Sequence, residues 1–169
     1  VMDTSWASAL ARELCPKPVV DVGSSKCLML RASAAAGRVM KLGKAPSLTN
    51  TLVPEKALAD FGIEADGGEA LAKAQYEKLV PFLTQCHVGG ASLVATAGVR
   101  KFATKAGLLI DETLSVHSLL ACKSHPCHSH YAKDEALLGG RFRTLRVRVL
   151  SGQEEADLEF ADASAAIRS

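Results

Sequence analysis

The architecture of this chain depends most on residues 19–30, which have the sequence VVDVGSSKCLML. The valines in the first half of this segment are β-branched and predict a buried strand over Val19–Val22. Cys27–Leu30 predicts a second strand, and the polar residues between the two apolar runs predict the turn of a hairpin. We therefore expect the sheet of this protein to begin here.

Asp21 is the unusual residue of this hairpin, because a carboxylate among valines costs free energy unless a partner compensates for its burial. Gly23 allows a ligand to approach the backbone closely. Ser24 and Ser25 then offer hydroxyls and amides to phosphate oxygens, and Asp21 offers a carboxylate to a metal ion or its water. The alternative is an ordinary hairpin with a solvated Asp21 at its end.

Length and composition exclude several classes of protein. The 169 residues suit one domain or one lobe of a larger protein, and a hydrophobic content of 48% is sufficient for a core. A net charge of +2 gives no electrostatic basis for binding nucleic acid or an anionic membrane, and no apolar run reaches membrane-spanning length. Among the five cysteines, Cys15, Cys27 and Cys86 lie in or beside predicted elements, which favours reduced thiols and a cytoplasmic location.

The remaining segments predict an α/β lobe with a mixed sheet. A third strand over Gly37–Gly43 completes an antiparallel meander with the hairpin. The other expected elements are a short helix over Val1–Leu14, loop over Lys44–Gly68, a helix over Glu69–Cys86 that Pro81 kinks or restarts, a strand over Ala91–Thr96, a helix over Ala97–Leu109, a strand over Leu145–Leu150 and a helix over Gln153–Ile167. Ligand sites in such folds lie beyond the carboxyl ends of parallel strands.

A second group of candidate residues lies where the strand over Ala91–Thr96 gives way to a helix. Arg100 falls in the first turn of that helix, where the helix dipole disfavours a cation unless an anion accompanies it. The Thr96 hydroxyl and the free amides of the first turn would give such an anion further donors. The alternative is a surface arginine above a helix that begins with small residues.

The helix expected from Gln153 onward has two carboxylates at its start. Ser151 and Glu154 have the spacing of a capping box, which gives Glu154 a structural role. Glu155 is not needed for that cap, and its place in the first turn allows it to orient a water molecule as a general base. The alternative is that Glu155 only complements the positive end of the helix dipole.

A cluster of histidines and cysteines follows the predicted helix at Ala97–Leu109. Its members are His117, Cys122, His125, Cys127, His128 and His130. These residue types suit zinc, but their spacing matches no standard zinc finger. We therefore expect an exposed, mobile loop insertion without a bound metal, and a zinc site is the alternative.

Three motifs, in this order, resemble those of the exopolyphosphatase and guanosine-pentaphosphatase family: DVGSS at Asp21–Ser25, VATAGVR at Val94–Arg100 and SGQEEA at Ser151–Ala156. They are also similar to those of the related apyrases, the nucleoside triphosphate diphosphohydrolases. Both families belong to the actin-like ATPase superfamily. The resemblance implies one lobe of an actin-like, ribonuclease H-like fold over residues 17–169. Residues 1–16 are then an N-terminal extension, and the His/Cys-rich insertion covers about 111–143.

The resemblance also implies roles for individual residues. Gly23, with the two serines after it, corresponds to the first phosphate loop of the family, and Thr96 lies in the second motif. Arg100 contacts phosphate, and Glu155 is the catalytic base that activates water. Asp21 holds Mg²⁺, the implied cofactor, or its bound water.

The substrate implied is polyphosphate, guanosine pentaphosphate or a nucleoside polyphosphate. Ala156 after the glutamate pair favours the exopolyphosphatase branch, whereas Ala97 and Gly98 before the arginine favour an apyrase-type nucleoside tri- and diphosphatase. Family members have a second lobe that opens with another Asp-containing, Gly-rich loop, and no such loop follows Glu155. We therefore expect a fragment, a truncated product or a degenerate relative that is inactive alone. The rival hypothesis is a non-catalytic binding or regulatory module.

Overall fold

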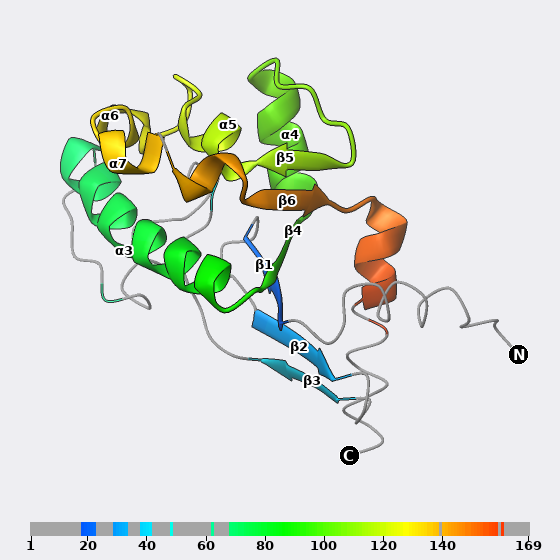
Figure 1. Cartoon of the computed structure of the whole chain (residues 1–169). Coiled ribbons are helices and arrows are strands. Elements are labelled where there is room, and N and C mark those ends of the chain that lie inside the picture. The colour runs from blue at the N-terminus through cyan, green and yellow to red at the C-terminus, as the bar shows by residue number, and fades with distance from the viewer. Residues whose placement is uncertain are drawn as a thin grey trace, which may run out of the picture.

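The computed structural model describes residues 18–22, 29–33, 38–41, 48, 62, 68–138, 140–158 and 160. Its strands form a single six-stranded sheet with the order β3-β2-β1-β4-β6-β5 (Figure 1). The strands are β1 (Pro18–Asp21), β2 (Met29–Ser33), β3 (Arg38–Lys41), β4 (Ser92–Ala95), β5 (Thr113–Ser115) and β6 (Arg146–Val149). The expected N-terminal extension with its helix, the Gly23–Ser25 turn and almost all of the loop at Lys44–Gly68 lie outside the described residues.

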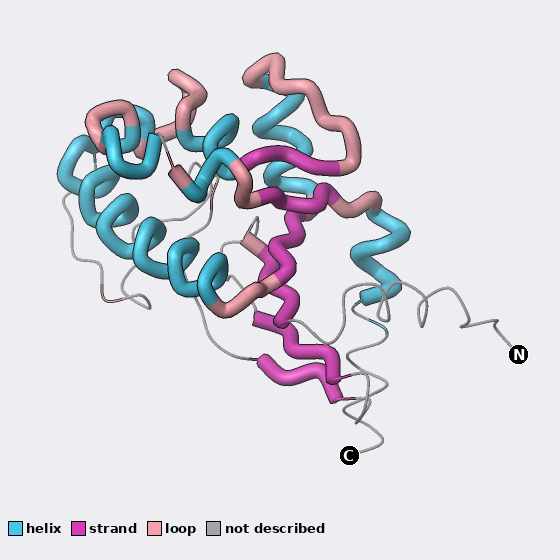
Figure 2. Tube along the Cα trace, viewed as in Figure 1, coloured by secondary structure: helices cyan, strands magenta, loops and turns pink. Residues whose placement is uncertain are grey.

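The sheet is mixed, as the sequence predicts. Strands β1, β2 and β3 form an antiparallel meander, and β1, β4 and β6 run parallel to one another. Strand β5 adds to the far edge, antiparallel to β6. The prediction of an α/β fold with a meander followed by alternating helices and strands is therefore confirmed. Figure 2 shows the strands, in magenta, side by side through the middle of the molecule.

The helices are α3 (Gly68–Val88), α4 (Ala97–Lys105), α5 (Val116–Leu120), α6 (His128–Tyr131) and α7 (Glu135–Leu138), with a 3₁₀ turn η2 (Arg141–Arg143). Residues 152–158 form a further helix directly after β6, drawn in orange in Figure 1. The short helix α6 lies beside the first turns of α3, and α7 packs against η2 (Figure 1). None of the described helices combines the length and the apolar character that a membrane crossing requires.

Helix α3 confirms the predicted helix and explains its limits. Its buried side chains recur at helical spacing: Ala72, Gln75, Leu79, Leu83 and Cys86. The helix continues through Pro81, whose side chain is exposed. It ends because Gly90 adopts a φ of 67°, a left-handed conformation that glycine accepts without strain.

Helix α4 is shorter than the sequence predicts. It ends at Lys105 because Gly107 adopts a φ of 69°, and the Gly107 amide then donates to the Thr104 carbonyl at 3.1 Å. The Leu108 amide donates to the Ala103 carbonyl at 2.9 Å. These two bonds satisfy carbonyls that the helix end leaves free, so the left-handed glycine, rather than the apolar run after it, sets the boundary.

An exposed loop was expected for Cys122, His125, Cys127, His128 and His130, and this expectation is wrong for His125 and Cys127. These residues belong to the segment at about 111–143. This segment contributes β5 to the sheet, and its side chains Leu119, Leu120, Tyr131 and Phe142 are fully buried in the main hydrophobic core. His125 and Cys127, which the sequence placed in a solvated insertion, are 2% and 0% exposed. The segment is therefore part of the main hydrophobic core.

Candidate active site

The three parallel strands β1, β4 and β6 end on the same side of the sheet. We call this side, formed by their carboxyl ends, the sheet edge below. The Val22 amide, directly after β1, donates to the carbonyl of Val94 in β4 at 2.9 Å. The Leu150 amide, directly after β6, donates to the carbonyl of Ala95 in β4 at 2.8 Å. The chain therefore leaves β1, β4 and β6 at the same level, which is the position where α/β folds place their ligand sites.

The first predicted motif reaches this edge through Asp21, the last residue of β1. Asp21 is half-buried and pairs in register with Val94 of the neighbouring strand, and Val22 is fully buried. The residues that follow, Gly23, Ser24 and Ser25, lie outside the described part of the chain. The structure thus fixes where the chain enters the predicted phosphate loop.

The second motif forms the junction between β4 and α4. Thr96 is the N-cap of α4, with an extended backbone and no side-chain capping hydrogen bond. Its carbonyl accepts the amides of Val99 and Arg100 at 3.1 and 3.2 Å, so the amides of Ala97 and Gly98 precede the first intrahelical bonds. No acidic residue lies in this first turn. The helix start therefore offers donors and a partial positive charge to an anion.

The third motif forms the capping box that the sequence predicts. The Ser151 amide donates to Glu154 Oε2 at 2.8 Å, and the Glu154 amide donates to Ser151 Oγ at 3.2 Å. Arg148 Nη2 donates to the other carboxylate oxygen of Glu154 at 3.0 Å. The hydrogen bond from the Ser151 backbone is the main cause that lowers the pKa of Glu154. Both oxygens of Glu154 are thus engaged in holding the helix start.

The structure brings Arg100 and Glu155 together across the two helix starts. Arg100 Nη2 lies 3.9 Å from Glu155 Oε2, and the two side chains are 32% and 33% exposed. The distance is at the outer limit of an ion pair, so this contact contributes little to stability. Arg100 Nη1 is buried and has no hydrogen-bond partner among the described residues. A guanidinium with an unused donor thus faces a carboxylate that no cap requires.

The residues at this edge are compatible with Mg²⁺ only when a phosphate ligand supplies part of its coordination. Within the described ranges, no group of three or more His, Cys, Asp or Glu side chains could hold a metal ion by itself. Mg²⁺, however, usually keeps several waters and binds through one or two carboxylates plus substrate phosphates. A single half-buried carboxylate such as Asp21 suits that mode, because the phosphates supply the remaining ligands.

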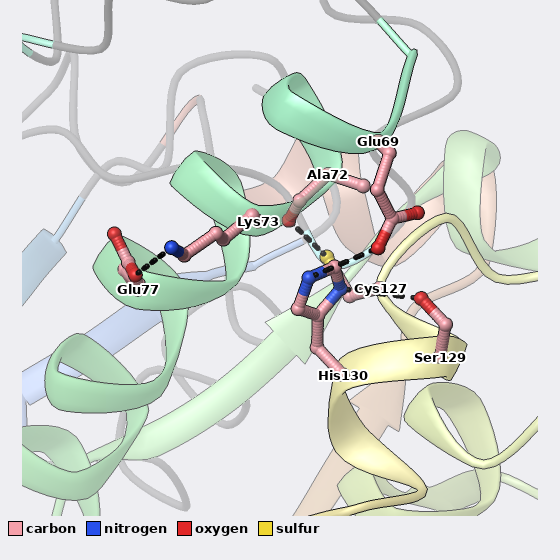
Figure 3. Close-up of polar contacts among 7 residues, drawn as sticks. All are labelled: Glu69, Ala72, Lys73, Glu77, Cys127, Ser129 and His130. Carbon is pink, nitrogen blue, oxygen red and sulfur yellow. Dashed lines mark hydrogen bonds and ion pairs between the residues drawn. The ribbon is translucent and has the colours of Figure 1, made fainter.

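The His/Cys segment packs against helix α3, and Figure 3 shows the contact between α3 and α6. His130 Nε2 lies 3.2 Å from Glu69 Oε1, and its Nδ1 lies 3.2 Å from Ser129 Oγ. Cys127 Sγ lies 3.6 Å from the Ala72 carbonyl, to which the thiol donates. These side chains attach α6 to α3. The apolar residues between 114 and 120 were the signal in the sequence that this segment belongs to the core.

None of the described cysteines, Cys86, Cys122 and Cys127, is in a disulfide. Burial raises the pKa of the Cys86 thiol to about 11, so this thiol stays protonated and unreactive near neutral pH. Cys15 and Cys27 lie outside the described residues.

Comparison with known proteins adds no relative: no family model matches the chain, and neither a curated protein nor a solved structure matches it significantly. The geometry of the sheet edge is therefore the basis for the function proposed next.

Proposed function

We propose that this chain is the N-terminal lobe of a Mg²⁺-dependent phosphoanhydride hydrolase with an actin-like, ribonuclease H-like architecture. It would release terminal phosphate from polyphosphate, guanosine pentaphosphate or a nucleoside polyphosphate. The observation that supports this most is the 3.9 Å approach of Arg100 to Glu155 at the edge where β1, β4 and β6 end. The meander joined to parallel strands also supports the choice of architecture.

Arg100 and the start of α4 hold the terminal phosphoryl group in this proposal. The Arg100 guanidinium, part of a side chain that is 32% exposed, and the amides of Ala97 and Gly98 supply hydrogen bonds to phosphate oxygens. Thr96 adds a hydroxyl that no capping bond occupies. The amides of Gly23–Ser25, which follow β1 in the sequence, would add to the stabilisation of charge on the transferring group. Preorganised donors of this kind stabilise the charge on a transferring phosphoryl group.

Glu155 acts as the general base. Its carboxylate accepts a proton from a water whose oxygen forms a bond to the terminal phosphorus, while the bond from phosphorus to the bridging oxygen breaks. The products are inorganic phosphate and a substrate shorter by one phosphate. Mg²⁺, when bound near Asp21, would neutralise charge on the phosphate oxygens.

The rival function is a non-catalytic module that binds phosphate-bearing ligands. The exposure of about a third of both Arg100 and Glu155 favours it, because one lobe leaves these side chains open to water. Electrostatic catalysis is strong only where water is excluded. A second lobe over this edge would supply that exclusion, and so the two functions differ in whether such a lobe is present.

Phosphate release distinguishes these functions. The chain alone is expected to release negligible phosphate, whereas the chain joined to a second lobe is expected to do so in a Mg²⁺-dependent manner that a chelator abolishes. In the two-lobed protein, Arg100→Ala should lower the rate by about 10²–10³-fold, the usual effect of removing one preorganised donor. The neighbouring Lys101→Ala is the matched control, because Lys101 is exposed and should leave the rate unchanged. Full activity of Arg100→Ala would refute the assignment of Arg100.

A further inference from the structure

His125 connects the core segment after α5 to the end of β1. Its Nε2 forms a hydrogen bond with the Leu48 carbonyl, and its Nδ1 accepts the Cys127 amide at 3.1 Å. Leu48 in turn donates its own amide to the Val22 carbonyl at 2.8 Å. His125 is 2% exposed, and Leu48 and Val22 are fully buried. A continuous chain of buried hydrogen bonds therefore runs from Cys127 to Val22.

The partners of His125 determine which of its nitrogens carries the proton. A carbonyl only accepts, so Nε2 must donate to Leu48, and a backbone amide only donates, so Nδ1 must accept from Cys127. The ring is thus a neutral Nε2–H tautomer with both nitrogens in use. Burial is the main cause that lowers the pKa of His125 to about 4, which keeps the ring neutral near pH 7.

The His125 ring contacts both the segment that holds the end of β1 and the helix α4. On one side, Val22 is held by both its backbone groups: its amide donates to Val94, and its carbonyl accepts from Leu48. On the other side, His125 packs edge-on against Phe102 of α4, with ring centroids 5.8 Å apart and an interplanar angle of 84°. Helix α4 is the element that carries Arg100 at its start.

We propose that His125 is a positioning residue of the candidate active site, which fixes the end of β1, through Leu48, relative to α4. Its effect on phosphate release rests on the proposed function. The positioning itself is measurable without any activity. Sequence reasoning placed this histidine in a solvated loop or a zinc site, and neither role accounts for its two backbone partners.

Two substitutions separate the two hydrogen bonds of His125. His125→Gln retains a side-chain donor at the position of Nε2 and so keeps the bond to Leu48. His125→Asn retains an acceptor at the position of Nδ1 and so keeps the bond to Cys127, but it loses the bond to Leu48. The measurement is hydrogen exchange of the Leu48 amide by NMR, with the Leu150 amide as reference. Leu150 lies at the same sheet edge, and its amide bonds to the Ala95 carbonyl, which is not part of the hydrogen-bond chain through His125.

The expected result is that His125→Asn speeds exchange at Leu48 by about 10- to 100-fold, the effect of losing one buried hydrogen bond. Exchange at Leu150 should change far less, and His125→Gln should restore most of the protection at Leu48. Equal effects at Leu48 and Leu150, or equal effects of the two variants, would overturn the proposal. If neither variant folds, ¹⁵N shifts of the wild-type ring decide: a neutral Nε2–H tautomer at pH 7 supports it, and an Nδ1–H tautomer or an imidazolium overturns it.

The exchange result is independent of the proposed function. Loss of protection at Leu48 without any phosphate release from the two-lobed protein would refute the hydrolase and keep His125 as the residue that fixes the end of β1. Phosphate release together with unchanged exchange at Leu48 would support the hydrolase and refute the positioning role of His125.

Discussion

Glu155→Gln is expected to lower Mg²⁺-dependent phosphate release by the two-lobed protein by about 10²–10⁴-fold, the usual effect of losing a general base. Glutamine has nearly the shape of glutamate, but it does not accept a proton from the attacking water. Glu155 makes neither capping bond, so folding should be unaffected. Its carboxylate lies 3.9 Å from Arg100 Nη2, a loose contact whose loss costs little.

Glu154→Gln is the matched control for that variant, since it removes the adjacent carboxylate by the same change. Glutamine also serves a capping box, so the bonds with Ser151 should persist and activity should fall far less. The two variants are compared by phosphate release, with thermal unfolding as the check on folding. An inactive Glu154→Gln beside an active Glu155→Gln would show that the roles of the two carboxylates are reversed.

Tyr131→Ala is expected to lower the free energy of unfolding by about 3–5 kcal/mol, as for other large aromatic side chains in a core. Tyr131 is fully buried and stacks on Phe142, with ring centroids 6.4 Å apart and an interplanar angle of 14°. Its hydroxyl lies 2.9 Å from His117 Nδ1. The substitution therefore removes a ring, its aromatic partner contact and a hydrogen bond from the segment that the sequence placed outside the core.

Urea unfolding of three variants measures this effect. Tyr131→Phe removes only the hydroxyl and should cost about 1 kcal/mol. Leu109→Ala is the surface control, because Leu109 is 85% exposed and its truncation should change the free energy of unfolding by less than about 0.5 kcal/mol. If Tyr131→Ala matched Leu109→Ala, the segment would be a peripheral loop, and the core described above would be wrong.

Local patterns in the sequence were sufficient to predict most of the sheet and the long helix. The valines of β1, the alternation in β6 and the helical spacing in α3 each express burial within one element. The capping box was predictable for the same reason, since Ser151 and Glu154 are only three residues apart. These features need no knowledge of distant contacts.

The segment between α4 and β6 could not be predicted in this way. Strand β5 has only three residues, and it exists because it pairs with β6 more than thirty positions later. His125 and Cys127 are polar residue types whose burial depends on the distant carbonyls of Leu48 and Ala72. Residue type alone favours exposure or metal binding for such side chains, because their partners are set by the tertiary fold.

The candidate site was predictable in part. Asp21, Thr96 and Ser151 lie at or just after the ends of parallel strands, and the rule for parallel strands was enough to expect them at one edge. The approach of Arg100 to Glu155 also depends on the angle at which two helices leave the sheet, which no local pattern encodes.

The central claim, that the starts of the two helices after β4 and β6 form one phosphate site, is tested most directly by NMR titration of the chain with tripolyphosphate and Mg²⁺. We predict saturable shifts at the amides of Ala97 and Gly98 and at the Arg100 guanidinium. These shifts should be lost in Arg100→Ala and retained in Lys101→Ala. Shifts confined to other parts of the chain, or shifts at α4 that persist in Arg100→Ala, would contradict a phosphate site at this edge.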